Sequence, residues 1–124
     1  QLTKLCNQIL VSVNLLAVCE ALVFARKNGL DPLTMIDAVS GGAASSWQLV
    51  NLGPKVAKRD FQPGFMVDLM QKDLRLVLET ATANPTPLPA TALVQQLFKS
   101  VQIQGLGREG TQALAKALEA LAGI

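Results

Sequence analysis

The stretch from Thr3 to Lys27 reads TKLCNQILVSVNLLAVCEALVFARK, and it decides the fold. Residues 9–18 are apolar on nearly every face when wound as a helix. Thr3 is expected to cap this helix, Arg26 and Lys27 suit the negative end of its dipole, and Gly29 is placed to end it. A helix that is apolar all round is surrounded by other helices or by a second subunit, so we expect a buried central helix.

Working outward from this helix, glycine and proline divide the rest of the chain into five further helical segments, without any convincing strand. Asp31 followed by Pro32 is a helix-start signal, as are Ser45 and Ser46. The first of these segments is expected to direct Leu33, Ile36 and Val39 inward. The expected helices cover residues 32–40, 46–52 (ending or kinking at Gly53-Pro54), 66–83, 89–104 and 111–122. The sequence therefore predicts one all-α domain of about six helices over residues 1–124.

Composition excludes several classes of function. Half of the residues are hydrophobic and only 16% are charged, which indicates that part of the surface is covered by another domain or subunit. The net charge of +2 is too small for a nucleic-acid-binding face. The chain has no histidine, which excludes histidine-dependent metal sites and Ser–His or Cys–His nucleophiles, and we expect no metal. Since tyrosine is also absent, acid–base chemistry must come from Lys, Asp, Glu or Cys.

The two cysteines, Cys6 and Cys19, lie within the first helix. A rise of ~1.5 Å per residue places them about 20 Å apart along the axis, too far for a disulfide. Free thiols suit a reducing compartment, and the N-terminus lacks the features of a signal peptide, so we expect a cytoplasmic protein. The charge-free segment 5–19 is shorter than a membrane span of about 20 residues and contains polar side chains, so we expect no membrane association.

One polar group could carry chemistry at the start of the first helix. Lys4, Asn7 and Gln8 are spaced so that an ammonium and two amides share one helix face. They could converge on one bound oxyanion or hydroxyl. The alternative is an ordinary solvated helix start.

Further candidates lie elsewhere in the chain. Lys72 and Asp73 fall in the middle of the helix expected at 66–83, where Asp68 and Lys72 could instead form a solvated ion pair. Phe65 is either a core anchor or a wall of a substrate site. The apolar pattern predicts that Glu20 is buried, where it could be a partner in a polar network.

Taken in order, these residues form a set of motifs that resembles one family. The set is Lys4-Leu5-Cys6-Asn7-Gln8, Glu20-Ala21, Asn28-Gly29-Leu30-Asp31-Pro32, Ser40-Gly41-Gly42-Ala43-Ala44-Ser45, Phe61-x-Pro63-Gly64-Phe65 and Gln71-Lys72-Asp73-Leu74. It is similar to the C-terminal domain of the β-hydroxyacid dehydrogenases, which include 3-hydroxyisobutyrate dehydrogenase, tartronate semialdehyde reductase and the glyoxylate/succinic semialdehyde reductases. The resemblance covers essentially the whole chain.

This resemblance implies a fold and a function. The fold would be the C-terminal type of 6-phosphogluconate dehydrogenase, with a long apolar first helix. A Rossmann domain that binds NAD or NADP would precede it and is absent from this chain. The helical domain would bind a small hydroxy acid or semialdehyde, close the active site and form a homodimer or higher homo-oligomer. The resemblance implies catalysis by Lys4, substrate binding by Asn7, Gln8 and Phe65, and cofactor contact by Lys72 and Asp73.

Some segments depart from the family pattern. The glycine-rich G-x-G that precedes the lysine in the family is not in this chain. Glu109-Gly110-Thr111-Gln112 stands where many members carry an acid and a serine, so no role is transferred to it. Gly41-Gly42-Ala43 favours the tartronate semialdehyde reductases. The sequence leaves open the substrate, the choice between NAD and NADP, and an alternative function as a non-catalytic helical interaction module.

Overall fold

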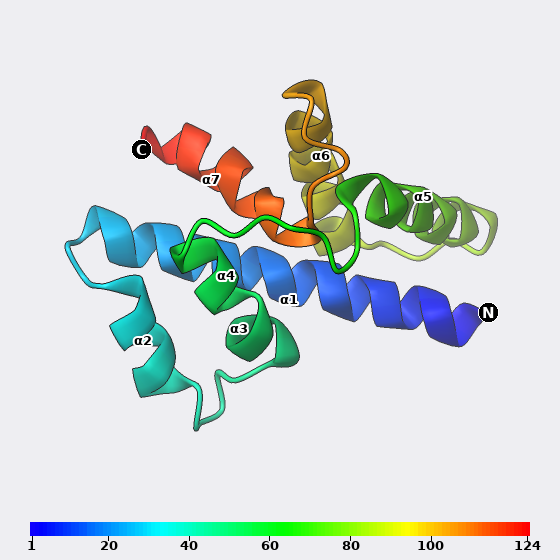
Figure 1. Cartoon of the computed structure of the whole chain (residues 1–124). Helices are drawn as coiled ribbons and strands as arrows, with labels where there is room; N and C mark the ends of the chain where they lie inside the picture. Colours follow the sequence, from blue (N-terminus) through cyan, green and yellow to red (C-terminus); the bar gives the residue numbers. More distant parts are fainter.

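Seven α-helices and one short 3₁₀ helix make up the fold, in a computed structural model that describes all residues from 1 to 124 (Figure 1). An isolated bridge between Met66 and Gly110 is the only strand-like pairing, so the all-α prediction is confirmed. The helices are α1 (Leu2–Lys27), α2 (Pro32–Val39), α3 (Trp47–Asn51), α4 (Gly53–Ala57), α5 (Val67–Ala83), α6 (Pro89–Ile103), η1 (Thr111–Ala113, 3₁₀) and α7 (Leu114–Ala122).

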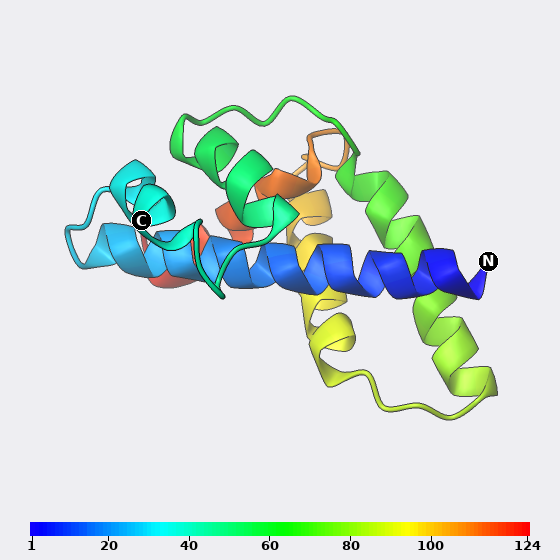
Figure 2. The ribbon, with the colours of Figure 1, turned by 90° about the horizontal axis from the view of Figure 1, so that it is seen from below.

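The long helix α1 forms the axis of the molecule and contacts each of the other six α-helices. Helices α2 and α3 lie on one side of it and α6 and α7 on the other, while α5 crosses its N-terminal half (Figures 1 and 2). The hydrophobic core lies mainly between α1 and the α5–α7 layer. Its fully buried members include Leu15, Leu74, Val94, Phe98 and Leu114. The apolar first helix is therefore the central helix that the sequence predicts.

Three predicted helix ends are confirmed in atomic detail. The Asp31 carboxylate accepts a hydrogen bond from the Thr34 N–H at 2.9 Å, and the Ser46 hydroxyl accepts one from the Leu49 N–H at 3.0 Å. Gly29 ends α1 with φ +77°, a left-handed conformation that favours glycine. Each of these signals acts over a few neighbouring residues, which is why the sequence alone could place them.

Three local predictions are wrong. Thr3 lies inside α1, because the helix begins at Leu2 and its N-cap is Gln1, two residues before Thr3 and without a side-chain bond. Leu33 is 41% exposed, and Glu20 is exposed rather than buried. The α1 face that carries Glu20 has no neighbour to cover it here. By contrast, the helix expected to end or kink at Gly53-Pro54 does end there: α3 stops at Asn51, and Gly53 starts the separate short helix α4, whose first turn tolerates proline.

Length and composition alone would allow α1 to cross a bilayer. This differs from the expectation that the charge-free segment 5–19 is too short and too polar for a membrane span. In this fold 44% of its most apolar 18-residue window is buried. Because the helix packs against α5, α6 and α7, its apolar character is also that of a core helix.

Both cysteines are free, as expected, and the buried Cys19 gives the fold a pH-dependent stability. Burial raises the pKa of the Cys19 thiol above its ordinary value of 9.0, and the charges of Glu119 and Glu20 add to the rise. Above that pH the unfolded chain releases a proton that the folded chain retains. The free energy of unfolding should therefore be independent of this thiol below about pH 9 and fall above it, by at most ~1.4 kcal/mol per pH unit.

Urea unfolding on either side of this pH measures the effect. Cys19→Ala should flatten the alkaline decline in the free energy of unfolding, whatever its cost in packing. Replacing the exposed Cys6 by alanine is the matched control and should leave the decline unchanged. An equal alkaline slope in wild type and Cys19→Ala would show that Cys19 does not contribute.

Candidate active site on the N-terminal half of α1

A chain of hydrogen bonds joins α1 to α5 at the predicted site. The Gln8 Nε2 donates to Asp73 Oδ2 at 2.8 Å, and the Asn7 Nδ2 donates to Gln8 Oε1 at 3.0 Å. Gln8 is 7% exposed and Asp73 is 9% exposed, whereas Asn7 lies at the surface. The structure thus brings together three of the six predicted site residues, from segments that are 65 positions apart.

Two exposed lysines flank this chain of hydrogen bonds. Lys4 lies one helical turn before Gln8 on α1, and Lys72 directly precedes Asp73 on α5. Neither ammonium has a carboxylate partner within the 4.0 Å limit for an ion pair. Both positive charges are therefore free to meet an anionic ligand.

The expected Asp68–Lys72 ion pair is wrong, because another partner holds Asp68. Gln102 of α6 donates from Nε2 to Asp68 Oδ1 at 2.8 Å, and the Asp68 N–H donates to the Gly107 carbonyl at 2.8 Å. A Cβ at Gly107 would overlap the Asp68 carboxylate, so the loop after α6 approaches as closely as only glycine allows. This arrangement holds the first turn of α5 to α6 and leaves Lys72 unpaired.

Phe65 lies just before α5, and its carbonyl accepts a hydrogen bond from the Thr111 N–H at 2.9 Å. Its side chain is 38% exposed and does not belong to the core cluster. The interpretation of Phe65 as a core anchor is therefore wrong, and its ring is available to a ligand. The hydrogen bond to Thr111 ties Phe65 to η1, and no hydrogen bond connects it to Lys4 or Asn7.

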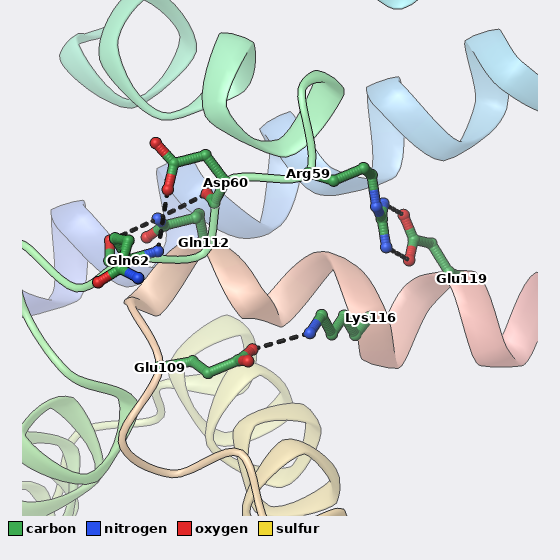
Figure 3. A network of polar contacts seen from close by, with 7 residues as sticks. All are labelled: Arg59, Asp60, Gln62, Glu109, Gln112, Lys116 and Glu119. Atoms are coloured by element: carbon green, nitrogen blue, oxygen red, sulfur yellow. Dashed lines mark hydrogen bonds and ion pairs between the residues drawn. The ribbon is translucent and has the colours of Figure 1, made fainter.

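A polar network that the sequence did not reveal fixes the loop between α4 and Phe65 (Figure 3). Arg59 makes a bidentate pair with Glu119 of α7, and Arg26 of α1 donates to the same carboxylate at 2.9 Å. The hydrogen bond to Glu119 raises the pKa of Arg59. Gln112 donates to the carbonyls of Asp60 and Gln62.

A second ion pair continues this network on α7. The Lys116 ammonium lies 2.9 Å from Glu109 Oε1 and 4.2 Å from the centre of the Phe61 ring. These charges are paired with one another, so the network acts as a clamp on the loop rather than as a reactive site. No helical spacing indicates it, because most of its partners come from loops and helices that are far apart in the sequence.

The exposed candidate residues Lys4, Asn7, Phe65 and Lys72 lie on an open surface of this chain. None of the main cavities is lined by Lys4, Asn7, Gln8, Phe65, Lys72 or Asp73. The cavity of about 220 Å³ at Arg26, Arg59 and Glu119 belongs to the paired network instead. A ligand at the candidate site would therefore be only partly enclosed by this chain.

Comparison with known proteins places the chain in a family. The family profile described as "NAD-binding of NADP-dependent 3-hydroxyisobutyrate dehydrogenase" matches residues 1–118. The chain therefore belongs to the family of NAD(P)-dependent hydroxyacid dehydrogenases typified by 3-hydroxyisobutyrate dehydrogenase. This confirms the resemblance that the motifs indicated.

Individual relatives support this placement. The 2-hydroxy-3-oxopropionate reductase of Escherichia coli is 45% identical over 122 residues, which are 98% of this chain and 42% of that protein. The 3-hydroxyisobutyrate dehydrogenase of Salmonella typhimurium superimposes with a TM-score of 0.88 at 34% identity, over 92% of this chain and 40% of that one. The Mycobacterium tuberculosis 3-hydroxyisobutyrate dehydrogenase, solved with L-serine, has a TM-score of 0.86 at 26% identity, over 95% and 43%.

These comparisons also confirm the predicted fold type with its long apolar first helix. The chain spans about two fifths of the length of the relatives it matches. The activity of a whole enzyme is therefore a proposal for this chain.

Proposed function

We propose that this chain is the substrate-binding, catalytic-lysine and dimerisation domain of an NAD(P)-dependent oxidoreductase. The enzyme would interconvert a β-hydroxy acid and its semialdehyde or oxo acid. One observation carries the proposal: two exposed, unpaired lysines, Lys4 and Lys72, flank the hydrogen-bonded chain that begins at Asn7. The similarity to a reductase and a dehydrogenase supports the same reaction class.

The residues of this chain suit the proton-transfer half of such a reaction. When bound, the nicotinamide supplies the hydride for reduction of the carbonyl carbon. Lys4 would give a proton to the carbonyl oxygen as the hydroxyl forms, and take it back in the reverse direction. Asn7, one turn further along α1, would hydrogen-bond the same oxygen or the substrate carboxylate. The Phe65 ring would cover the substrate and exclude water.

This chain fits only part of a cofactor site. It has no strand followed by a glycine-rich phosphate loop, whereas the free ammonium of Lys72 suits an anionic part of NAD or NADP. We therefore propose that most of the cofactor site lies on a Rossmann domain outside this chain. That domain would also close the open surface around Lys4.

The proposed homodimer or higher homo-oligomer rests on the uncovered apolar residues of α1. Leu2, Leu10 and Phe24 are 68%, 62% and 71% exposed, which is unusual for a helix that otherwise forms the core. A cytoplasmic location, without a membrane, metal or nucleic acid as partner, completes the proposal.

The proposal predicts turnover by the longer polypeptide that joins this domain to a nicotinamide-binding domain. Oxidation of NADH and NADPH is followed by absorbance with a panel of small semialdehydes and oxo acids. We expect at least one carbonyl substrate to be reduced, and the isolated chain to be inactive with the same panel. Absence of turnover with every substrate and both cofactors would favour the non-catalytic interaction module.

A further inference from the structure

The hydrogen bonds behind Asn7 determine which way each amide faces. A carboxylate only accepts hydrogen bonds, so Gln8 must turn its NH₂ group toward Asp73. The Gln8 carbonyl then has to face Asn7, which must present its own NH₂ group to Gln8. The Asn7 side chain is left with its carbonyl oxygen and one N–H for any other partner.

The three hydrogen-bonded residues Asn7, Gln8 and Asp73 differ in their exposure to solvent. Gln8 and Asp73 are more than nine-tenths buried, and their hydrogen bonds point to each other and to Asn7. Only Asn7 is exposed. The low exposure of both side chains leaves Gln8 little surface for direct substrate contact and Asp73 little surface for direct cofactor contact, the roles that the resemblance implies.

We infer that Asp73 and Gln8 are positioning residues that hold the Asn7 amide in a single orientation toward the substrate. This inference rests on the proposed function and replaces the direct contacts of Gln8 and Asp73 with an indirect role. In that orientation the free Asn7 carbonyl accepts from a substrate hydroxyl, and its free N–H donates to a substrate carboxylate or carbonyl. A substrate with both groups, such as a hydroxy acid, matches this pair.

A pair of substitutions that exchanges the amide of Gln8 and the carboxylate of Asp73 tests the positioning role directly. Asp73→Asn allows both orientations of the Gln8 and Asn7 amides, because the asparagine amide can donate as well as accept a hydrogen bond. Gln8→Glu places two carboxylates against each other. Each should lower kcat/KM for the hydroxy acid by about 3–10-fold, the usual scale for freeing one ordered side chain, with the cofactor KM unchanged.

The double variant Gln8→Glu/Asp73→Asn should recover most of this loss at the same net charge. The amide introduced at position 73 would donate to the carboxylate introduced at position 8. That carboxylate would also accept from Asn7, which restores the original Asn7 orientation. The exposed pair Gln96→Glu/Asp37→Asn is the charge-matched control and should behave as wild type. Melting temperatures identify any variant that fails to fold. If Gln8→Glu fails to fold, comparison of kcat/KM between Asp73→Asn and the double variant still tests the inference.

Side-chain amide NMR of the 124-residue chain gives a readout that is independent of activity. The Asn7 Nδ2 proton that bonds to position 8 should have the shift of a hydrogen-bonded amide in wild type and in the double variant, and should move toward the shift of a solvated amide in Asp73→Asn. A double variant no better than Asp73→Asn, or a raised cofactor KM in Asp73→Asn, would overturn the inference. If Lys4→Ala and Asn7→Ala were also without effect, the proposed function itself would have failed.

Discussion

Replacing Lys4 by alanine is expected to lower kcat of the longer polypeptide by about 10²–10⁴-fold, the usual contribution of a general acid–base group. The loss should appear in kcat and kcat/KM alike, because the proton moves in the transition state. Folding should hardly change, since Lys4 is exposed and has no ion-pair partner. Steady-state kinetics over a range of pH, together with the melting temperature, measure both effects.

Lys99→Ala is the matched control for this substitution. Lys99 is also an exposed helical lysine without an ion-pair partner, but it lies on α6, outside the candidate site. Its removal should leave kcat unchanged. Near-native kcat in Lys4→Ala across the pH range would remove Lys4 from the mechanism.

Substitution of Asn7 and Lys72 should separate substrate binding from cofactor binding. Asn7→Ala removes a hydrogen bond to a charged or polar substrate group, which contributes ~1–3 kcal/mol. The value of kcat/KM should therefore fall by about 5–150-fold, and the substrate KM should rise. Lys72→Ala should raise the KM for the cofactor more than that for the substrate. The exposed Asn51 provides a control, because Asn51→Ala lies on α3, away from the candidate site.

Varying each substrate at saturating concentrations of the other measures these patterns. The assignment of Lys72 to the cofactor side is wrong if Lys72→Ala changes only the substrate KM. The assignment of Asn7 is wrong if both KM values stay at their wild-type levels.

Much of the fold was predictable because its signals are local. The Asp31 and Ser46 caps and the left-handed Gly29 each depend on contacts within a few residues. The wrong predictions of burial come from the opposite situation. The exposure of Glu20 depends on which neighbours cover α1, and an all-round apolar pattern does not contain that information.

The candidate site was predictable only within each helix. Helical spacing places Lys4, Asn7 and Gln8 on one face, but no spacing rule indicates that Gln8 bonds to Asp73 of another helix. For the same reason the sequence suggested an Asp68–Lys72 pair, whereas Gln102, 34 positions beyond Asp68, takes its carboxylate. Family resemblance connected these distant motifs, and the structure showed which of them are in contact.

Chemical rescue of Lys4→Ala tests the central claim most directly. Small primary amines added to this variant can occupy the space of the missing side chain and carry the proton in its place. If Lys4 moves the proton, kcat should rise with the concentration of ethylamine and should not respond to ethanol, a neutral molecule of similar size. A Lys4→Ala enzyme that is slow but gains nothing from any amine, or gains equally from ethanol, would contradict a proton-transfer role for Lys4.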